Sequence, residues 1–197
     1  FMGWGPEEMG SYSYWGGKYD LIKDLEEKGH TIYISNVGPV SSNWDRAVEL
    51  YYQIKGGQVD YGKGHSDVYG IIRKPKNKKY KGLYPKWSKD NPIHLIGHSM
   101  GGQTARMLDY LLTTSISDTT GRKESSFFLG EEQNGLIKSI TTISTPHNGT
   151  TLSTFISAGI PFLQDMIAAV SYTHLRAHET REDRVFPRHG VKKKWGG

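Results

Sequence analysis

The sequence predicts an α/β fold with a mostly parallel sheet and flanking helices. Two apolar stretches with the length and composition of strands, residues 93–96 and 136–144, flank a helix-forming run over 103–112. Strands that alternate with helices are typical of parallel sheets, because helices form their crossover connections. The short run Gly97–Gly101 joins the first strand to the helix, and the carboxyl end of such a strand is where these sheets place functional sites.

Three further elements are expected earlier in the chain. Residues 19–28 place apolar side chains on one face of a helix that Gly29 ends, and residues 31–35 are typical of a strand. Residues 42–45 fit a capping box, in which Ser and Asp side chains satisfy free N–H groups at a helix start. The helix that begins there is expected to continue to about residue 54.

Composition limits the class of protein. The 197 residues fit one domain, hold no Cys, and include neither an 18-residue apolar run nor a basic-then-apolar leader. We therefore expect no transmembrane segment and no signal peptide in this stretch. The net charge of +5 is concentrated in residues 170–197, which hold seven Lys and Arg against three Asp and Glu. We interpret the basic stretch Arg73–Lys81 as a solvated loop and expect no nucleic-acid binding.

The organisation of the chain follows from these shifts in composition. Residues 1–169 are expected to form one α/β domain, with a small inserted loop region over about 56–84 that is rich in Gly, Lys and Tyr. Residues 113–135 are expected to be a polar surface loop. Val170–Thr180 resembles the translation of an adaptor used in preparing sequencing libraries. We therefore interpret 170–197 as a non-native tail and exclude it from functional reasoning.

The run Gly97–Gly101 has the pattern G-x-S-x-G. Between a strand and a helix this pattern is typical of a nucleophile elbow, whose sharp turn projects a Ser hydroxyl outward. Gly97 and Gly101 are expected to let strand and helix approach each other because they lack a Cβ atom. The chemistry predicted is acyl transfer to Ser99 and then to water. The alternative is a Gly- and Ser-rich turn before an ordinary helix.

Longer strings resemble the large secreted triacylglycerol lipases of bacilli and staphylococci. The similar stretches are residues 14–17, 41–47, 56–62, 94–104 and 141–149. The resemblance implies an α/β-hydrolase fold with a helical lid, hydrolysis of lipid esters at an oil–water interface, and secretion. It also implies that this chain lacks the N-terminal strands and the C-terminal half of that fold.

The resemblance assigns catalytic roles to two residues of the elbow and to Phe1. Ser99 matches the nucleophile, and the backbone N–H groups of Met100 and Phe1 match the two donors of the oxyanion hole. The acid and the His that should activate Ser99 come from the C-terminal half in this family, in the chain order Ser, acid, His. Among the histidines of residues 1–169 only His147 follows Ser99, and the resemblance implies a His at this position besides the catalytic one, so we interpret His147 as structural. We expect the fragment by itself to turn over substrate hardly at all.

A metal site is also implied by the resemblance. The family binds zinc through two Asp and two His, and Asp45 and His65 match two of these positions, whereas Ile71 stands at the position of the second His. The alternatives are a capping carboxylate for Asp45 and a loop His for His65. We expect no cofactor for the chemistry, a structural zinc in the complete protein as a hypothesis, and nothing definite for calcium.

Three other functions remain open from the sequence. A carboxylesterase or acyltransferase would use the same elbow with a different substrate. A non-catalytic hydrolase-like binding module would lack the acid and the His altogether. A basic nucleic-acid binder would depend on lysines outside residues 170–197.

Overall fold

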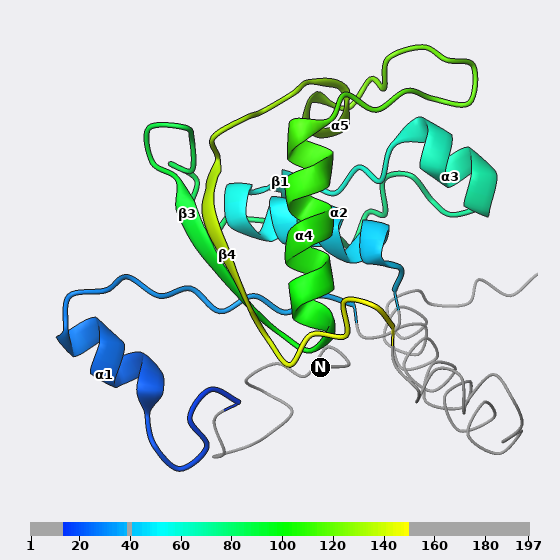
Figure 1. Cartoon of the computed structure of the whole chain (residues 1–197). Helices are drawn as coiled ribbons and strands as arrows, with labels where there is room; N and C mark the ends of the chain where they lie inside the picture. The colour runs from blue at the N-terminus through cyan, green and yellow to red at the C-terminus, as the bar shows by residue number, and fades with distance from the viewer. Residues whose placement is uncertain (1–13, 39–40, 150–197) are drawn as a thin grey trace, which may run out of the picture. The chain divides into compact units, whose positions relative to one another are not determined.

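The computed structural model describes residues 14–38 and 41–149, and Figure 1 presents the whole chain. The chain divides into two units, Phe1–His147 and Asn148–Gly197, and every described helix and strand belongs to the first. In order they are α1 (Leu21–Glu27), α2 (Asn43–Lys55), β1 (Gly57–Gln58), α3 (Lys63–Tyr69), β2 (Lys79–Tyr80), β3 (Ile93–His98), α4 (Met100–Thr113), α5 (Phe127–Gly130) and β4 (Ile137–Ile143). Phe1 and the interpreted tail, residues 170–197, lie outside the described residues.

A β–α–β unit carries the centre of the fold. Strands β3 and β4 pair in parallel, with His94 opposite Ser139 and His98 opposite Ile143. Helix α4 connects them and lies against both strands (Figure 1). The predicted strand–helix–strand order and the parallel pairing are confirmed for these elements. The second sheet of the described residues is the short antiparallel pair of β1 and β2.

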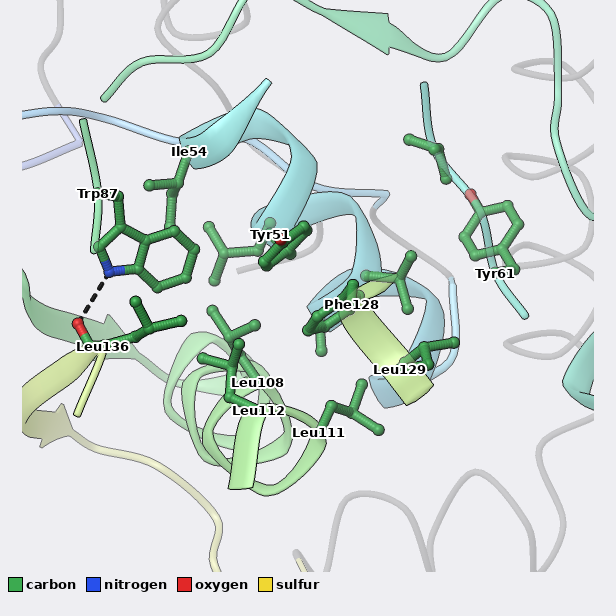
Figure 2. Packing of buried hydrophobic residues seen from close by; sticks show 14 residues of the cluster. Tyr51, Ile54, Tyr61, Trp87, Leu108, Leu111, Leu112, Phe128, Leu129 and Leu136 are labelled. Atoms are coloured by element: carbon green, nitrogen blue, oxygen red, sulfur yellow. Dashed lines mark hydrogen bonds between the residues drawn. The ribbon is translucent and has the colours of Figure 1, made fainter. Parts of the chain in front are cut away.

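The buried core lies between α2, α4 and the loops that lead into the two sheets. Tyr51 of α2 stacks on Phe128 with ring centroids 3.9 Å apart, and Leu108 of α4 is fully buried beside them (Figure 2). Trp87 is 1% exposed, and its indole Nε1 donates to the carbonyl of Leu136 at 2.8 Å. Because Leu136 immediately precedes β4, this bond ties the start of the strand to the core.

Replacing Trp87 with Ala is expected to lower the free energy of unfolding by about 4 kcal/mol, because it leaves a large cavity and removes one of the two donors, Trp87 Nε1 and Ile93 N, to the Leu136 carbonyl. The midpoint of urea unfolding measures this loss. Trp87→Phe is the matched variant, since it keeps most of the packing and removes the donor. It should cost less than half as much. Equal losses of stability for the two variants would contradict the expectation that packing contributes more than the hydrogen bond.

The strand predicted over residues 31–35 is wrong. The chain is irregular there, and among the described residues no neighbouring strand pairs with it. Side chains of α2 take the backbone groups that follow: Gln53 Oε1 accepts from Asn36 N at 3.0 Å, and Glu49 Oε2 accepts from Gly38 N at 3.0 Å. Alternation of apolar residues predicts a half-buried extended chain, but a strand also needs a partner.

Two short helices fall in regions predicted to be loops. Helix α3 begins at Lys63 after the N-cap residue Gly62, which has no capping side chain, so the sequence gives no start signal. Its start is instead held by tertiary bonds, with Gly64 N donating to Glu124 Oε2 at 3.0 Å. Helix α5 spans only Phe127–Gly130, which is too short for a periodic pattern. The predicted helix over 103–112 begins earlier, at Met100.

The basic stretch Arg73–Lys81 is only partly a solvated loop. Arg73 forms a two-pronged ion pair with Asp60, Nε to Oδ1 at 2.6 Å and Nη2 to Oδ2 at 2.8 Å. Lys78 Nζ lies 2.5 Å from Glu49 Oε1, and Glu49 is 2% exposed. Burial tends to raise the pKa of the Asp60 carboxyl, but its bonds to Arg73 and Gly62 N lower the pKa overall. The Lys78–Glu49 pair fastens the inserted region to α2, and the Arg73–Asp60 pair joins two parts of the inserted region itself.

Candidate active site

Ser99 occupies the sharp turn between β3 and α4. Its backbone has φ 56° and ψ −126°, a conformation that costs an L-residue about 1–3 kcal/mol. Bonds on both sides hold it there: Ser99 N donates to Ile143 O at 2.9 Å, and Ser99 O accepts from Gly102 N at 3.2 Å. The side chain is half-buried. A strained Ser at the end of a parallel strand is the geometry expected of a nucleophile elbow.

The glycines around the turn do not share one role. A Cβ atom at Gly97 would lie 2.5 Å from the backbone of Gly101 and Gly102, so only glycine allows β3 and α4 to meet there. The same expectation for Gly101 is wrong, because a Cβ at that position would meet nothing within 4 Å. The second required glycine is Gly102, whose Cβ would lie 2.8 Å from Thr142 and 2.2 Å from Thr145.

A second strained serine lies at the same edge of the sheet. Ser144 has φ 49° and follows β4 directly, as Ser99 follows β3. His98 and Ile143 are opposite each other in the parallel ladder, so the two serines succeed neighbouring residues of the two strands. Ser144 is exposed. Nothing in the sequence signals its backbone conformation, since apolar periodicity does not report a single left-handed residue.

The turn after β4 is fixed to α4 through His147. Arg106 Nη1 lies 3.0 Å from His147 Nδ1, and His147 Nε2 lies 3.0 Å from Thr142 Oγ1. An arginine can only donate, so Nδ1 must accept and Nε2 must carry the proton that it gives to Thr142. Both ring nitrogens therefore already have partners, and neither partner is Ser99. This geometry agrees with the interpretation of His147 as structural.

His98, beside the nucleophile position, is also engaged. Its Nδ1 lies 2.5 Å from the hydroxyl of Tyr14, and the two rings meet edge to face with centroids 5.8 Å apart. Burial raises the pKa of the Tyr14 hydroxyl, so it stays protonated near neutrality. The contact supports the elbow from the N-terminal segment and was not foreseen from the sequence, because 84 positions separate the two residues.

The two residues predicted as metal ligands do lie together. His65 Nε2 is 2.9 Å from Asp45 Oδ1, with side chains only 10% and 19% exposed. The imidazole is stacked on the indole of Trp44, with centroids 4.9 Å apart and planes 10° from parallel. Asp45 also sits in the first turn of α2, where its N–H donates to the capping Ser42 Oγ at 3.0 Å. The predicted cap is present, while the carboxylate turns to His65.

Comparison with known proteins decides the family. A family model described as "Lipase-like, C-terminal domain" matches residues 6–194. The chain belongs to this lipase-like family. Lipase 1 of Staphylococcus aureus (strain Mu50) is 47% identical over 144 residues, which are 70% of this chain and 21% of that protein. The resemblance stated from the sequence is thereby confirmed, and the chain spans about a fifth of the length of this curated relative.

Solved structures of this lipase-like family support the same conclusion. The crystal structure of Staphylococcus hyicus lipase matches with a TM-score of 0.78 at 38% identity, covering 89% of this chain and 47% of that one. EstA from Clostridium botulinum matches with a TM-score of 0.70 at 48% identity, covering 79% of this chain and 36% of that one. The β3–α4–β4 unit is thus part of a lipase-like fold. This chain matches less than half of each of these two solved chains.

The side chains of Asp45 and His65 do not by themselves form a structural zinc site in this chain. Such sites take four N, S or O ligands. Asp45 and His65 supply two, and Ile71, where the resemblance predicts the second His, is an aliphatic residue packed against the core. Among residues 14–38 and 41–149, no group of three or more His, Cys, Asp and Glu side chains is placed to hold a metal. The direct bond between His65 and Asp45 instead satisfies both groups.

Chelation is therefore expected to leave the stability of this chain unchanged. The melting temperature in EDTA should equal that in added zinc, because the Asp45–His65 pair is already satisfied without a metal. Differential scanning fluorimetry measures it. Ile71→His is the matched variant, since it supplies a third candidate ligand, and it should raise the melting temperature in zinc relative to EDTA. A zinc-dependent shift in the unmodified chain would contradict the prediction.

Met100 meets one requirement of its predicted role. It begins α4, where the first backbone N–H groups have no acceptor within the helix and point out of its end. The other predicted donor, Phe1, lies outside the described residues.

None of the helices among residues 14–38 and 41–149 has the length and hydropathy that crossing a bilayer requires.

Proposed function

We propose that this chain is part of a triacylglycerol lipase, a serine ester hydrolase whose nucleophile is Ser99. The observation that carries the proposal is the strained Ser99 between a parallel strand and a helix, at φ 56°. Family membership and the identity of 47% to Lipase 1 of Staphylococcus aureus support it. The proposed substrate is a lipid ester at an oil–water interface, met outside the cell, and the chemistry needs no cofactor.

The proposed reaction has two acyl-transfer steps. Ser99 Oγ attacks the ester carbonyl while a base takes its proton, and the tetrahedral oxyanion accepts N–H bonds from Met100 and from Phe1. Collapse of the intermediate breaks the bond to the alcohol, which leaves with that proton, and the acyl group stays on Ser99. Water then attacks the acyl-enzyme, and a fatty acid and free Ser99 result.

The base and its orienting acid are proposed to lie outside residues 1–197. His147 does not suit the role, because Arg106 occupies its accepting nitrogen. The chain covers 47% of the Staphylococcus hyicus lipase structure, which leaves room in a complete enzyme for an acid and a His after Ser99. Without a base a serine hydroxyl is a weak nucleophile, so the chain by itself should turn over esters hardly at all.

A chimera tests the proposal. Residues 1–147 would replace the matching stretch of Staphylococcus hyicus lipase, which then supplies the remainder of the domain. We expect hydrolysis of emulsified triolein by the chimera and none by the 197-residue chain. A folded chimera that cleaves no ester would refute the proposal. A chimera that prefers soluble short-chain esters, or transfers the acyl group to added alcohols, would favour the carboxylesterase or acyltransferase alternative.

A further inference from the structure

Contacts hold the end of β3 from both faces of the sheet. A Cβ atom at Gly97 would lie 2.5 Å from backbone atoms of α4, so this residue faces the helix, which lies against β3 (Figure 1). Because successive residues of a strand point to opposite faces, the side chain of His98 lies on the face that α4 does not cover. There the hydroxyl oxygen of Tyr14 lies 2.5 Å from His98 Nδ1. Tyr14 thus contacts the residue that immediately precedes Ser99.

A tight turn presents Tyr14 to the elbow. Gly16 has φ 97°, and a Cβ atom there would lie 2.2 Å from the carbonyl oxygen of Tyr19, so the turn requires glycine at this position. Tyr19 N donates to Gly16 O at 3.0 Å and closes the turn. The ring of Trp15 meets that of Tyr14 edge to face, with centroids 5.4 Å apart. The position of Tyr14 is therefore fixed by its own segment as well as by His98.

The backbone of Ser99 needs support from its surroundings. Its φ of 56° is costly for an L-residue, and such conformations persist only where the contacts around them leave no alternative. Two backbone bonds hold Ser99 itself, one to Ile143 O and one from Gly102 N. Neither bond involves the side chain of His98, which the hydroxyl of Tyr14 restrains. Tyr14 therefore opposes a rotation of the strand end that would carry Ser99 with it.

We propose that Tyr14 is a positioning residue, which acts through His98 to hold Ser99 in its strained conformation. The catalytic consequence rests on the proposed function, since the placement of Ser99 affects a rate only if Ser99 is the nucleophile. A displaced nucleophile reacts more slowly without weakening the binding of substrate, because the geometry of attack changes. The hydroxyl of Tyr14 should therefore contribute to kcat and not to KM. If Tyr14 merely packed against His98, a phenyl ring would serve as well.

Hydrogen exchange tests the positioning in the full 197-residue chain, without any ester. The variant is Tyr14→Phe, which keeps the ring and removes the hydroxyl. The amide of Ser99, which donates to Ile143 O, should exchange about fivefold faster in Y14F, the factor that corresponds to the net contribution of one hydrogen bond. The amides of Leu108 and Leu111, fully buried residues of α4, should exchange as before. Unchanged exchange at Ser99 would overturn the proposal, and so would a uniform acceleration, which would mean that the hydroxyl only stabilises the fold.

Kinetics of the chimera test the catalytic consequence. Y14F should lower kcat for triolein hydrolysis about fivefold and leave the apparent KM unchanged. His98→Phe keeps an aromatic ring for the edge-to-face contact and removes the nitrogen that Tyr14 binds. In the H98F background Y14F should lower kcat no further, because both substitutions remove the same bond. An equal loss in both backgrounds would overturn the proposal, since Tyr14 would then act without His98.

Tyr19→Phe is the matched control, because it removes a hydroxyl from the same turn. Tyr19 is 57% exposed and its hydroxyl bonds to Asp24, so Y19F should change neither the exchange at Ser99 nor kcat. A chimera that cleaves no ester would refute the proposed function, and hydrogen exchange would then decide the role of Tyr14 by itself. An active chimera in which Y14F leaves kcat unchanged would overturn this inference and leave the lipase proposal in place.

Discussion

Replacing Ser99 with Ala in the chimera is expected to lower kcat for ester hydrolysis by about 10⁶, as loss of a serine nucleophile does in a hydrolase with an intact base. Alanine has no oxygen to accept the acyl group, so both steps of the proposed reaction fail. Release of fatty acid from emulsified triolein, followed by titration, measures the loss. The melting temperature should not fall, because among the described residues the side chain of Ser99 makes no hydrogen bond.

Ser144 provides the matched control for this substitution. It is also a strained serine at the end of a parallel strand, with φ 49°, and it follows the residue next to His98 in the ladder. Ser144→Ala should reduce kcat no more than about tenfold, because it removes a hydroxyl near the site and not the nucleophile. A comparable loss for both variants would mean that the effect comes from the edge of the sheet as a whole. A fully active S99A chimera would rule out Ser99.

The part of the site that follows from local sequence was predictable. Strand β3, the turn at Ser99 and helix α4 succeed each other without a gap, and each has its own signal in apolar runs and glycines. The cap at Ser42 belongs to the same class, since its donor, Asp45 N, is three residues away. Parallel pairing of β3 with β4 followed from their separation by a helix. Apart from this pairing, these features depend on neighbours within a few positions.

Features that depend on distant contacts were not predictable. Residues 31–35 carry a strand-like pattern, yet side chains of α2 bind the nearby backbone instead of a second strand. Helix α3 starts without a cap because Glu124 accepts its Gly64 N–H. Gly102, and not Gly101, is the second required glycine because Thr142 and Thr145 of a distant segment approach it. Tertiary contacts override local preference in each case.

The contact between Asp45 and His65 was predictable for a different reason. Twenty positions separate them, so no local rule joins them, and only the resemblance to the lipases predicted that they share a site. The structure brings them together in the absence of any third donor among the described residues. In this chain the hydrogen bond between Asp45 and His65, with the imidazole stacked on Trp44, fastens α3 to α2, whereas a structural zinc would need four ligands.

Replacing Gly97 with Ala is expected to destabilise the chimera by about 4 kcal/mol or more, the range reserved for severe steric or packing defects. The added methyl would lie 2.5 Å from Gly101 C and from Gly102 N. These are backbone atoms of α4, so no side chain can rotate away, and β3 and α4 must separate. Separation would displace Ser99 and the N–H of Met100 together. Urea unfolding gives the loss of stability, and triolein hydrolysis should fall to background.

Gly101→Ala is the control that makes this test specific, because it adds the same methyl group four residues later. Nothing lies within 4 Å of that position, and an alanine inside a helix is favoured over glycine by up to about 1 kcal/mol. The G101A chimera should therefore be as stable as its parent or more stable, with activity retained. Similar losses in both variants would show that the pattern G-x-S-x-G tolerates no side chain at either glycine. A stable G97A chimera would mean that β3 and α4 do not approach as closely as the elbow requires, and the support that this geometry gives to Ser99 would be lost.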